Sequence, residues 1–392
     1  MSKIIKEANK VFFPVYNRYS IVLEKGEGVY LYDEDGNKYL DFAAGIAVFA
    51  LGYSNNSYKD AVKAQVDALI HTSNLYYNKS SVEAAEKLTK ASGMEKVFFT
   101  NSGTEAIEGA IKLARKYHYK KTGMPDGEII AMNHSFHGRS MGALAVTGQP
   151  KYQVAFGPML PHIKFADFND LDSVKAQITD KTCGILLETI QGEGGLYPAS
   201  QEFIAGIRKL CDENDILMIC DEIQCGMGRT GSMFAYQGYG ICPDVMTSAK
   251  ALGCGIPVGA FAAKGKGADA LEPGDHGSTY GGNPLACAAV SAVFDQYDKL
   301  ELMNHVKDVS SYLELQLDQL VAQYDCMVER RGKGLMQGVE CKIPVNDIIL
   351  KAQKKGLIII SAGANILRFV PPLIIEKKHV DEMIAILKDC LS

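Results

Sequence analysis

Short apolar runs alternate with amphipathic stretches between about residues 58 and 300, and this alternation constrains the fold more than any other feature. The apolar runs have the length of buried strands, and the stretches between them place apolar residues at helical spacing. Because such alternation puts helices on both faces of a sheet, it predicts an α/β domain with a mostly parallel sheet. The strand candidates are residues 96–100, 128–132, 183–188, 216–222, 244–248 and 258–263, and the helix candidates are residues 106–119, 171–178 and 199–214.

The two ends of the chain follow different patterns. Residues 19–42 alternate apolar and polar side chains around the turn sequences EKGEG and DEDGN, which predicts a small antiparallel meander. A helical stretch over residues 285–324 is followed by strand-like runs and a last amphipathic helix. We therefore predict an N-terminal segment with the meander (1–57), a large domain (58–285), and a linking helix with a smaller α/β domain (286–392).

Composition and charge exclude several classes of protein. The formal net charge is −5 and no long Lys/Arg run occurs, so we expect no nucleic-acid partner. The N-terminus has scattered charges rather than a secretory signal, and the apolar run at 42–52 is too short to span a membrane. The 10 cysteines are dispersed without a CxxC pair, which indicates a reduced, cytoplasmic protein without zinc or disulfides.

A polar loop at the end of the strand candidate 96–100 is a candidate anion site. The loop reads Asn101-Ser102-Gly103-Thr104, and a helix candidate starts directly on it. Backbone N–H groups at a helix start, together with two hydroxyls, suit one phosphate, although an ordinary N-cap has the same appearance. No GxxxxGK pattern is present and no GxGxxG pattern directly follows a strand candidate, so a nucleotide-binding loop is excluded.

Two further loops carry candidate ligand-binding side chains. Asp221 ends an apolar run, and Gln224 lies three residues after it. A carboxylate at this position suits a cationic group of a ligand. The alternative is a structural carboxylate that binds only neighbouring loop amides. The stretch NHSFHGRS offers Phe136 and Arg139, and Phe136 as a plain core residue is the alternative. Its histidines lack HExxH spacing and a third ligand, so we predict no metal site.

The stretch SAKALGCGIP places Lys250 between two apolar runs and beside glycines. Burying an ammonium costs several kcal/mol unless it is paired or neutralised, so the alternative is an edge lysine with a solvated head. Together with a phosphate site, an aromatic ring and an acid at a strand end, this lysine matches the needs of pyridoxal 5′-phosphate. We predict that its amine condenses with the aldehyde of that cofactor and later moves a proton, which needs a lowered pKa.

These motifs resemble the class III pyridoxal-phosphate-dependent aminotransferases, and among them most closely the acetylornithine aminotransferases. The resemblance covers essentially the whole chain and rests on the order and spacing of FFTNSGTEA, FHGRSMGALAVTGQPKY, QGEGG, CDEIQCGMGRTG, SAKALG and HGSTYGGNPLA. It implies the fold-type I, aspartate-aminotransferase-like architecture and a homodimer with shared active sites. The implied reaction moves the distal amino group of N2-acetyl-L-ornithine to 2-oxoglutarate, giving N-acetyl-L-glutamate 5-semialdehyde and L-glutamate, in arginine biosynthesis.

The resemblance also implies roles for cofactor-binding residues. Lys250 corresponds to the Schiff-base lysine and Asp221 to the partner of the pyridine nitrogen. Gln224 corresponds to the residue that binds the phenolic oxygen, and Phe136 to the ring stacked on the cofactor. The residues implied at the phosphate are Ser102, Gly103 and Thr104 of one subunit and Thr279 of its neighbour.

For the substrates, the resemblance implies that Arg139 binds the α-carboxylate, with Ser278 nearby. Arg368 is the candidate for a second carboxylate close to the ring, and Glu193 is its candidate removable partner; a permanent structural salt bridge is the alternative. Tyr16 lies where ornithine-specific relatives also place a tyrosine, so it does not discriminate between substrates.

Three other functions stay open on the sequence alone. The nearest is an ornithine or other ω-amino-acid aminotransferase, because substrate preference depends on pocket shape. A glutamate-1-semialdehyde aminomutase would use the same scaffold without a second keto acid. A non-enzymatic binding protein is disfavoured, because all the expected catalytic positions are filled.

Overall fold

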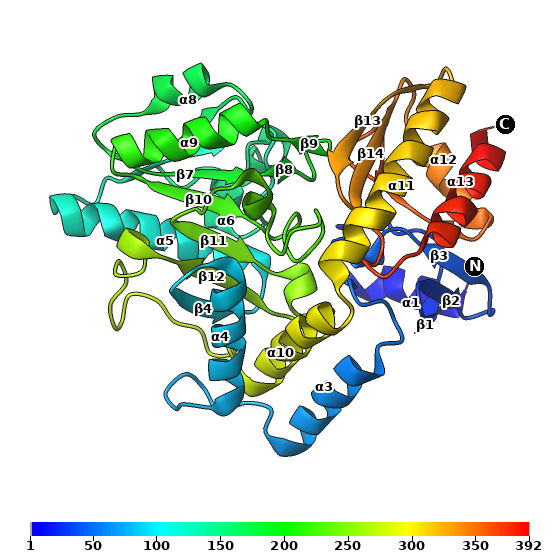
Figure 1. The fold of residues 1–392 in the computed structure, drawn as a ribbon, viewed down its shortest axis with the longest axis horizontal. Helices are drawn as coiled ribbons and strands as arrows, with labels where there is room; N and C mark the ends of the chain where they lie inside the picture. The colour runs from blue at the N-terminus through cyan, green and yellow to red at the C-terminus, as the bar shows by residue number, and fades with distance from the viewer. Residues whose placement is uncertain (1, 392) are drawn as a thin grey trace.

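A seven-stranded sheet forms the centre of the larger of two lobes in the computed structural model, which describes residues 2–391 (Figure 1). Neighbouring strands are parallel except where β12 pairs with β11 and β4, so the predicted α/β class is confirmed. The sequence missed only the edge strand β6. In sheet order the strands are β4 (Lys96–Thr100), β12 (Gly259–Ala263), β11 (Val245–Ser248), β10 (Leu217–Asp221), β7 (Thr182–Glu188), β5 (Glu128–Met132) and β6 (Ile163–Ala166).

Helices cover both faces of this sheet. Met218 and Cys220 of β10 belong to one core cluster together with Phe203 of α9 (Gln201–Glu213). Leu217 and Ile219 face the other way and pack in a second cluster with residues of α5 (Gly103–Thr122). Successive side chains of a strand point to opposite faces, so this division shows that β10 is buried on both sides.

The smaller lobe contains strands from both ends of the chain. The predicted meander is present, and its third strand pairs in parallel with β15, so that Leu40 lies opposite Leu357. The predicted boundaries after residues 57 and 285 stay a prediction. The strands of this lobe are β1 (Leu23–Glu27), β2 (Tyr30–Asp33), β3 (Lys38–Asp41), β13 (Met327–Lys333), β14 (Met336–Cys341), β15 (Leu357–Ile358), β16 (Ile360–Ser361) and β17 (Ile366–Phe369).

Two helices connect the lobes where the sequence predicted one helical stretch (Figure 1). The stretch divides into α10 (Pro284–Lys299) and α11 (Leu302–Gln323), because Glu301 has a left-handed backbone with a φ of 48°. α10 packs against α3 (Asn56–Ala68) and α4 (Lys79–Ser92), whereas α11 packs against the small lobe. The remaining helices are α2 (Ala44–Ala47), α6 (Met141–Ala145), α7 (Pro150–Gln153), α8 (Leu171–Gln177), α12 (Asn346–Lys354) and α13 (Lys377–Leu391).

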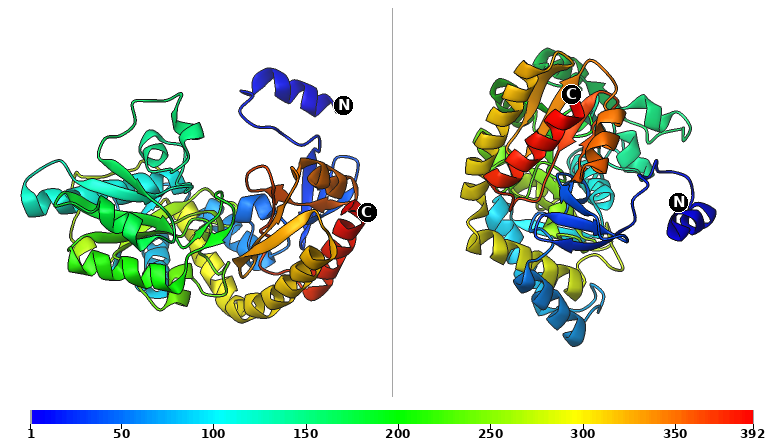
Figure 2. Two further views of the ribbon diagram at one scale, coloured as in Figure 1. Left: turned by 90° about the horizontal axis from the view of Figure 1, so that it is seen from above. Right: turned by 90° about the vertical axis from the view of Figure 1, so that its right-hand side faces the viewer.

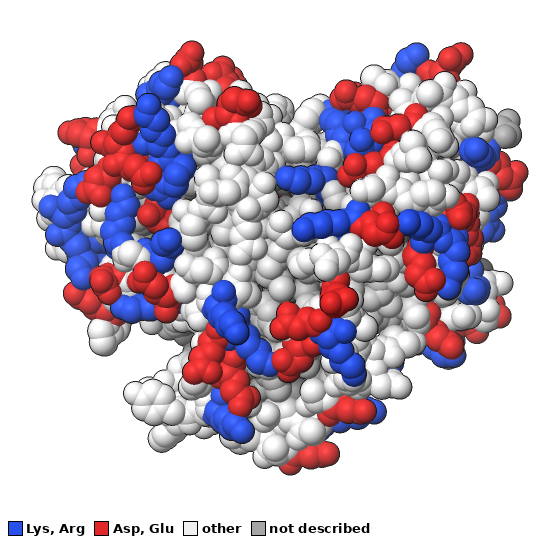
Figure 3. Space-filling view, in the orientation of Figure 1, with Lys and Arg blue, Asp and Glu red and all other residues white. Residues whose placement is uncertain are grey.

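The N-terminal helix α1 (Lys3–Val11) has no buried residue and lies apart from both lobes (Figure 2). The apolar side chains that follow it, such as Phe13, are also exposed. Within residues 2–391, no helix is both long enough and apolar enough to cross a membrane. On the face shown in Figure 3, basic and acidic side chains form small mixed groups.

Candidate active site

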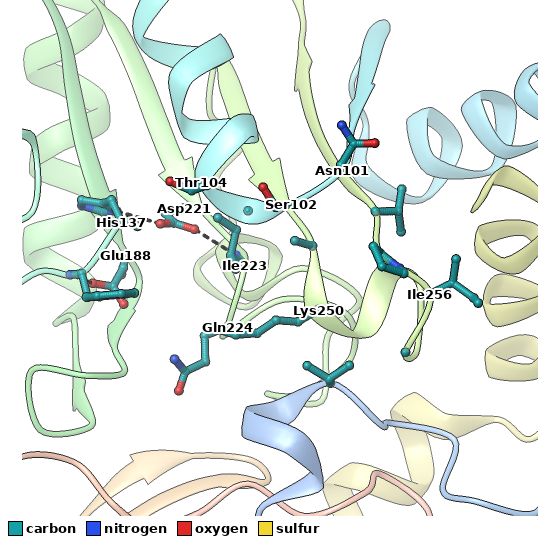
Figure 4. A pocket seen from close by; sticks show the side chains of 18 residues that line it. Asn101, Ser102, Thr104, His137, Glu188, Asp221, Ile223, Gln224, Lys250 and Ile256 are labelled. Carbon is teal, nitrogen blue, oxygen red and sulfur yellow. Dashed lines mark hydrogen bonds and ion pairs between the residues drawn. The ribbon is translucent and has the colours of Figure 1, made fainter. Parts of the chain in front are cut away.

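A cavity of about 340 Å³ lies at the carboxyl ends of β7, β10 and β11, beside the start of α5. Carboxyl ends of parallel strands meet at one edge of a sheet, which is where ligands bind in such folds. The structure therefore brings together residues that are far apart in the sequence (Figure 4). The predicted residues that line the cavity are Ser102, Gly103, Thr104, Phe136, Asp221, Gln224 and Lys250.

The start of α5 offers unpaired hydrogen-bond donors to this cavity. Ser102 is the N-cap, and its hydroxyl accepts from the N–H of Glu105 at 3.3 Å. The N–H groups of Gly103 and Thr104 have no acceptor within residues 2–391, as expected at a helix start. A Cβ on Gly103 would lie 2.9 Å from Ile223, so a larger residue would crowd this loop. Free donors at a positive helix end suit a phosphate group.

Asp221 is held by three hydrogen bonds at the end of β10. One carboxylate oxygen lies 2.7 Å from Nδ1 of His137, and the other accepts from the N–H of Ile223 and the hydroxyl of Thr247. The Asp221 carboxylate and the His137 imidazole are buried, and Figure 4 shows their contact beside the cavity. Asp221 is thereby fixed in one orientation. The sequence analysis missed His137, for which the only signal was its place directly after Phe136.

Lys250 follows β11 and starts a short 3₁₀ helix (Lys250–Leu252). Its φ of 49° is unusual for a residue other than glycine, and such strain clusters at functional sites. Its amine makes no hydrogen bond or ion pair with any other residue in the range 2–391. Burial lowers the pKa of the Lys250 amine, and the carboxylates of Glu193 and Asp221 oppose that effect. A lowered pKa leaves more of the amine neutral and able to react.

Glu193, Arg368 and Gln224 form a cluster beside the cavity, in which Arg368 and Gln224 are buried and the Glu193 side chain is 25% exposed. Arg368, on β17 of the small lobe, donates to Glu193 at 2.5 Å and to the side-chain oxygen of Gln224 at 3.1 Å. Burial raises the pKa of Glu193, but the charge and the hydrogen bond of Arg368 bring it below the ordinary value. The predicted Glu193–Arg368 pair is thus present and joins the two lobes. Gln224 takes part in this cluster in addition to lining the cavity.

The other predicted substrate residues lie outside the cavity. The guanidinium of Arg139 is exposed and lies 4.0 Å from the centre of the Tyr152 ring. The hydroxyl of Ser278 accepts from the side chain of Asn101 at 3.3 Å. Thr279 and Tyr16 are exposed in this single chain, and neither lines the cavity.

Over residues 13–391 the chain matches the protein family described as aminotransferase class-III. The chain belongs to this family. Its relatives include an acetylornithine aminotransferase from Caldanaerobacter subterraneus, 48% identical over 390 residues and 99% of both chains. Another relative, an acetylornithine aminotransferase from Methanocaldococcus jannaschii, is 46% identical over 383 residues, which are 98% of this chain and 96% of the relative.

Solved structures of aminotransferases have the same fold. An ornithine aminotransferase from Toxoplasma gondii has a TM-score of 0.95 and 28% identity, covering 99% of this chain and 93% of its own. An acetylornithine aminotransferase from Elizabethkingia anophelis has a TM-score of 0.88 and 30% identity, covering 99% and 98% of the two chains. The chain is therefore a fold-type I aminotransferase.

Class-III aminotransferases depend on pyridoxal 5′-phosphate, and the cavity of this chain fits that cofactor. The unpaired N–H groups of Gly103 and Thr104 suit its phosphate. Asp221 presents a fixed carboxylate for the ring nitrogen, and the amine of Lys250 opens onto the same cavity for the aldehyde. The N–H groups, carboxylate and amine of the cavity are therefore those that this cofactor needs, as expected for the family.

Glu188 is a second residue of this aminotransferase site that the sequence analysis missed. It ends β7 opposite Asp221 of β10, and its buried carboxylate lines the cavity. Burial raises the pKa of Glu188 to about 7, while the charge of His137 opposes that rise. The signal in the sequence was an acid at the end of an apolar strand, which is the same signal that marked Asp221.

Proposed function

We propose that this chain is an acetylornithine aminotransferase. It transfers the distal amino group of N2-acetyl-L-ornithine to 2-oxoglutarate and so produces N-acetyl-L-glutamate 5-semialdehyde and L-glutamate. The observation that carries the proposal is the close similarity, over nearly the whole chain, to several proteins named acetylornithine aminotransferase. The arrangement of charged residues around the cavity supports it.

The residues of the cavity have separable tasks in amino-group transfer. Pyridoxal 5′-phosphate, when bound, supplies an aldehyde that takes up the amino group and a ring that withdraws electrons. Asp221, held by His137, Thr247 and the backbone of Ile223, keeps a negative charge in a fixed place for the ring nitrogen. The Lys250 amine, with its lowered pKa, accepts a proton from the substrate carbon and returns it elsewhere.

The Glu193–Arg368 pair explains how one cavity accepts two unlike amino donors. Acetylornithine reacts through its distal amine, so its α-carboxylate lies far from the ring, where Arg139 suits it. Glutamate reacts through its α-amine and needs a cation close to the ring, which Arg368 provides once Glu193 moves away. Exchange of one carboxylate for another on a buried arginine costs far less than leaving that arginine bare.

We further propose a cytoplasmic homodimer with shared active sites. Thr279 is exposed in the single chain, and a second copy would bring it to the phosphate site of the neighbouring subunit. Residues 11–16 expose apolar side chains, among them Phe12, Phe13 and Tyr16, and packing against a second copy would bury them. All ten cysteines are free, which supports a reducing compartment. Sedimentation equilibrium and the cofactor affinity of Thr279→Ala test the dimer.

A panel of amino donors tests the proposed function. We expect kcat/KM to be highest for acetylornithine and lower for ornithine, 4-aminobutyrate and succinyl-diaminopimelate. Highest kcat/KM with free ornithine would favour the second candidate, an ornithine aminotransferase, for which the fold similarity to the Toxoplasma gondii enzyme is the supporting observation. Turnover without 2-oxoglutarate would instead indicate an aminomutase.

A further inference from the structure

Glu188 is a buried carboxylate for which the proposed mechanism has no task. It lies at the end of β7, next to Asp221 on β10, and lines the same cavity. Its side chain makes no ion pair with a lysine or arginine among the described residues. A buried carboxylate without such a partner is costly unless hydrogen bonds stabilise its charge, so the identity of its donors is informative.

The two oxygens of Glu188 bind two different loops. Oε1 accepts from the N–H of Phe136 at 3.0 Å, and Oε2 accepts from the N–H of Gly192 at 3.0 Å. Phe136 lies on the wall of the cavity, and Gly192 directly precedes Glu193. One carboxylate therefore fixes both a wall of the cavity and the turn that carries the partner of Arg368.

The turn at Gly192 is tightly packed, so a shift of its backbone reaches the charged cluster. A Cβ on Gly192 would lie 2.6 Å from the side chain of Gln224. The amide of Gln224 in turn lies 3.4 Å from Glu193 and 3.1 Å from Arg368. A displacement of Gly192 would therefore displace the Gln224 side chain, which contacts both Glu193 and Arg368.

We infer that Glu188 is a positioning residue that holds the turn at Gly192 so that Glu193 covers Arg368. It thereby sets the balance between the two amino donors, an inference that rests on the carboxylate exchange in the proposed function. Both hydrogen bonds of Glu188 lie in a buried site, where a hydrogen bond is electrostatically stronger than in water. Loss of Glu188 frees the turn, and Glu193 then leaves Arg368 more readily.

Glu188→Ala tests this inference, because it removes both acceptors. Single-turnover rates of the cofactor-loaded enzyme are measured separately with acetylornithine and with glutamate. We expect the ratio of the two rates to move about tenfold toward glutamate, which is near the upper end of the effect of one intramolecular hydrogen bond. Equal losses with both donors would overturn the inference, since general damage to the site has that result.

Glu222 provides a matched control for this experiment. It is also a buried glutamate after a neighbouring strand, and its carboxylate also accepts from two backbone N–H groups, those of Ala235 and Tyr236. It does not line the cavity. Glu222→Ala should leave the donor ratio unchanged, and a shift as large as that of Glu188→Ala would count against a specific role for Glu188.

Binding of glutarate gives a readout that does not depend on turnover. Glutarate has two carboxylates and no amine, so its binding requires Arg368 to be released from Glu193. Calorimetry on the cofactor-loaded enzyme should show about tenfold tighter binding to Glu188→Ala than to wild type. An unchanged affinity in the folded, loaded variant would overturn the inference while leaving the acetylornithine reaction in place.

A more conservative variant covers the case in which Glu188→Ala does not fold. Glu188→Gln keeps one acceptor, so both the donor ratio and the glutarate affinity should change in the same directions and by less. The proposed function is tested by a separate result, because it is wrong if the wild-type enzyme does not react with acetylornithine. Tighter glutarate binding by the Glu188 variants would still support the positioning role in that case.

Discussion

The cofactor side of the cavity is built within one sheet, whereas the substrate side joins two lobes. Asp221 ends β10, Lys250 follows β11, and the start of α5 follows β4, all in the seven-stranded sheet. Glu193 lies on a turn of the large lobe, while its partner Arg368 lies on β17 of the small lobe. The first set is fixed by the sheet, and the second depends on a contact between lobes.

The hydrogen bonds on the two sides differ in the same way. Asp221 is bound by an imidazole, a hydroxyl and a backbone N–H that all belong to the large lobe. Among the residues that the structure describes, the Glu193 carboxylate has only side-chain partners, Arg368 and Gln224, and an incoming carboxylate can replace it. The cofactor side is therefore suited to hold one ligand, and the substrate side to alternate between two.

Substitution of Lys250 should have the largest effect, because no other amine of residues 2–391 lines the cavity. We expect Lys250→Ala to abolish transamination while the fold and much of the cofactor affinity persist, since the phosphate and ring-nitrogen contacts remain. Activity assays and cofactor absorbance measure the two quantities. Lys264→Ala is a control on a neighbouring lysine outside the cavity. Retention of a tenth of wild-type turnover by Lys250→Ala would refute its role.

Asp221→Asn should be nearly as severe, because it keeps the shape of the side chain and removes its charge. Two unit charges about 4 Å apart interact by about 4 kcal/mol at an effective dielectric constant of 20, or about three pK units for the ring nitrogen. Thr247→Val, which removes one hydrogen bond and keeps the carboxylate, should cost far less. A near-normal kcat in cofactor-loaded Asp221→Asn would contradict this assignment.

The cofactor side was predictable from the sequence because it lies where strands end. Asp221, Lys250 and Ser102 each follow an apolar run, and the carboxyl ends of parallel strands share one edge of the sheet. Glu188 was missed although it ends such a run, because its partners are backbone N–H groups that no residue type marks. The loops that place the Phe136 and Gly192 N–H groups against Glu188 come together only in the tertiary structure, so a local sequence pattern does not predict these contacts.

Elements of the fold were missed for related physical reasons. β6 lies at the edge of the sheet and pairs only with β5, so its sequence needs no long apolar run. β13 is largely polar, and of its residues only Met327 and Arg331 are buried. No glycine or proline lies at the helix break at Glu301, so the sequence did not predict that break. For the substrate side, the sequence supplied Glu193 and Arg368 only through the family resemblance.

Glu193→Ala should act selectively, which sharpens the contrast between the two sides. Without Glu193, Arg368 is uncovered, so the half-reaction with glutamate should be unchanged or faster and that with acetylornithine about tenfold slower. Single-turnover kinetics with each donor measure this. Glu193→Gln, which keeps the size of the side chain, should change the rates of the two half-reactions in the same directions. A permanent structural salt bridge would instead give equal losses with both donors.

The smallest expected effect concerns stability rather than activity, and it involves Glu222, which follows Asp221 but does not line the cavity. Burial raises the pKa of Glu222 from 4.5 to about 8 in the folded chain, although the N–H groups of Ala235 and Tyr236 oppose that rise. Between these two values the folded state binds more protons than the unfolded state. The contribution of Glu222 to the free energy of unfolding is therefore fully present below about pH 4.5 and is lost as the pH rises through about 8.

Glu222→Gln removes this titration, so its stability relative to wild type should improve as the pH rises from 5 to 9, by at most about 1.4 kcal/mol per pH unit within that window. Urea unfolding of both proteins at several pH values measures the difference. Glu202→Gln, at an exposed position of α9, should show no such trend because its carboxylate is solvated in both states. A difference between Glu222→Gln and wild type that stays constant with pH would mean that Glu222 is ionised throughout. Its two backbone donors, the N–H groups of Ala235 and Tyr236, would then be sufficient to stabilise a buried charge.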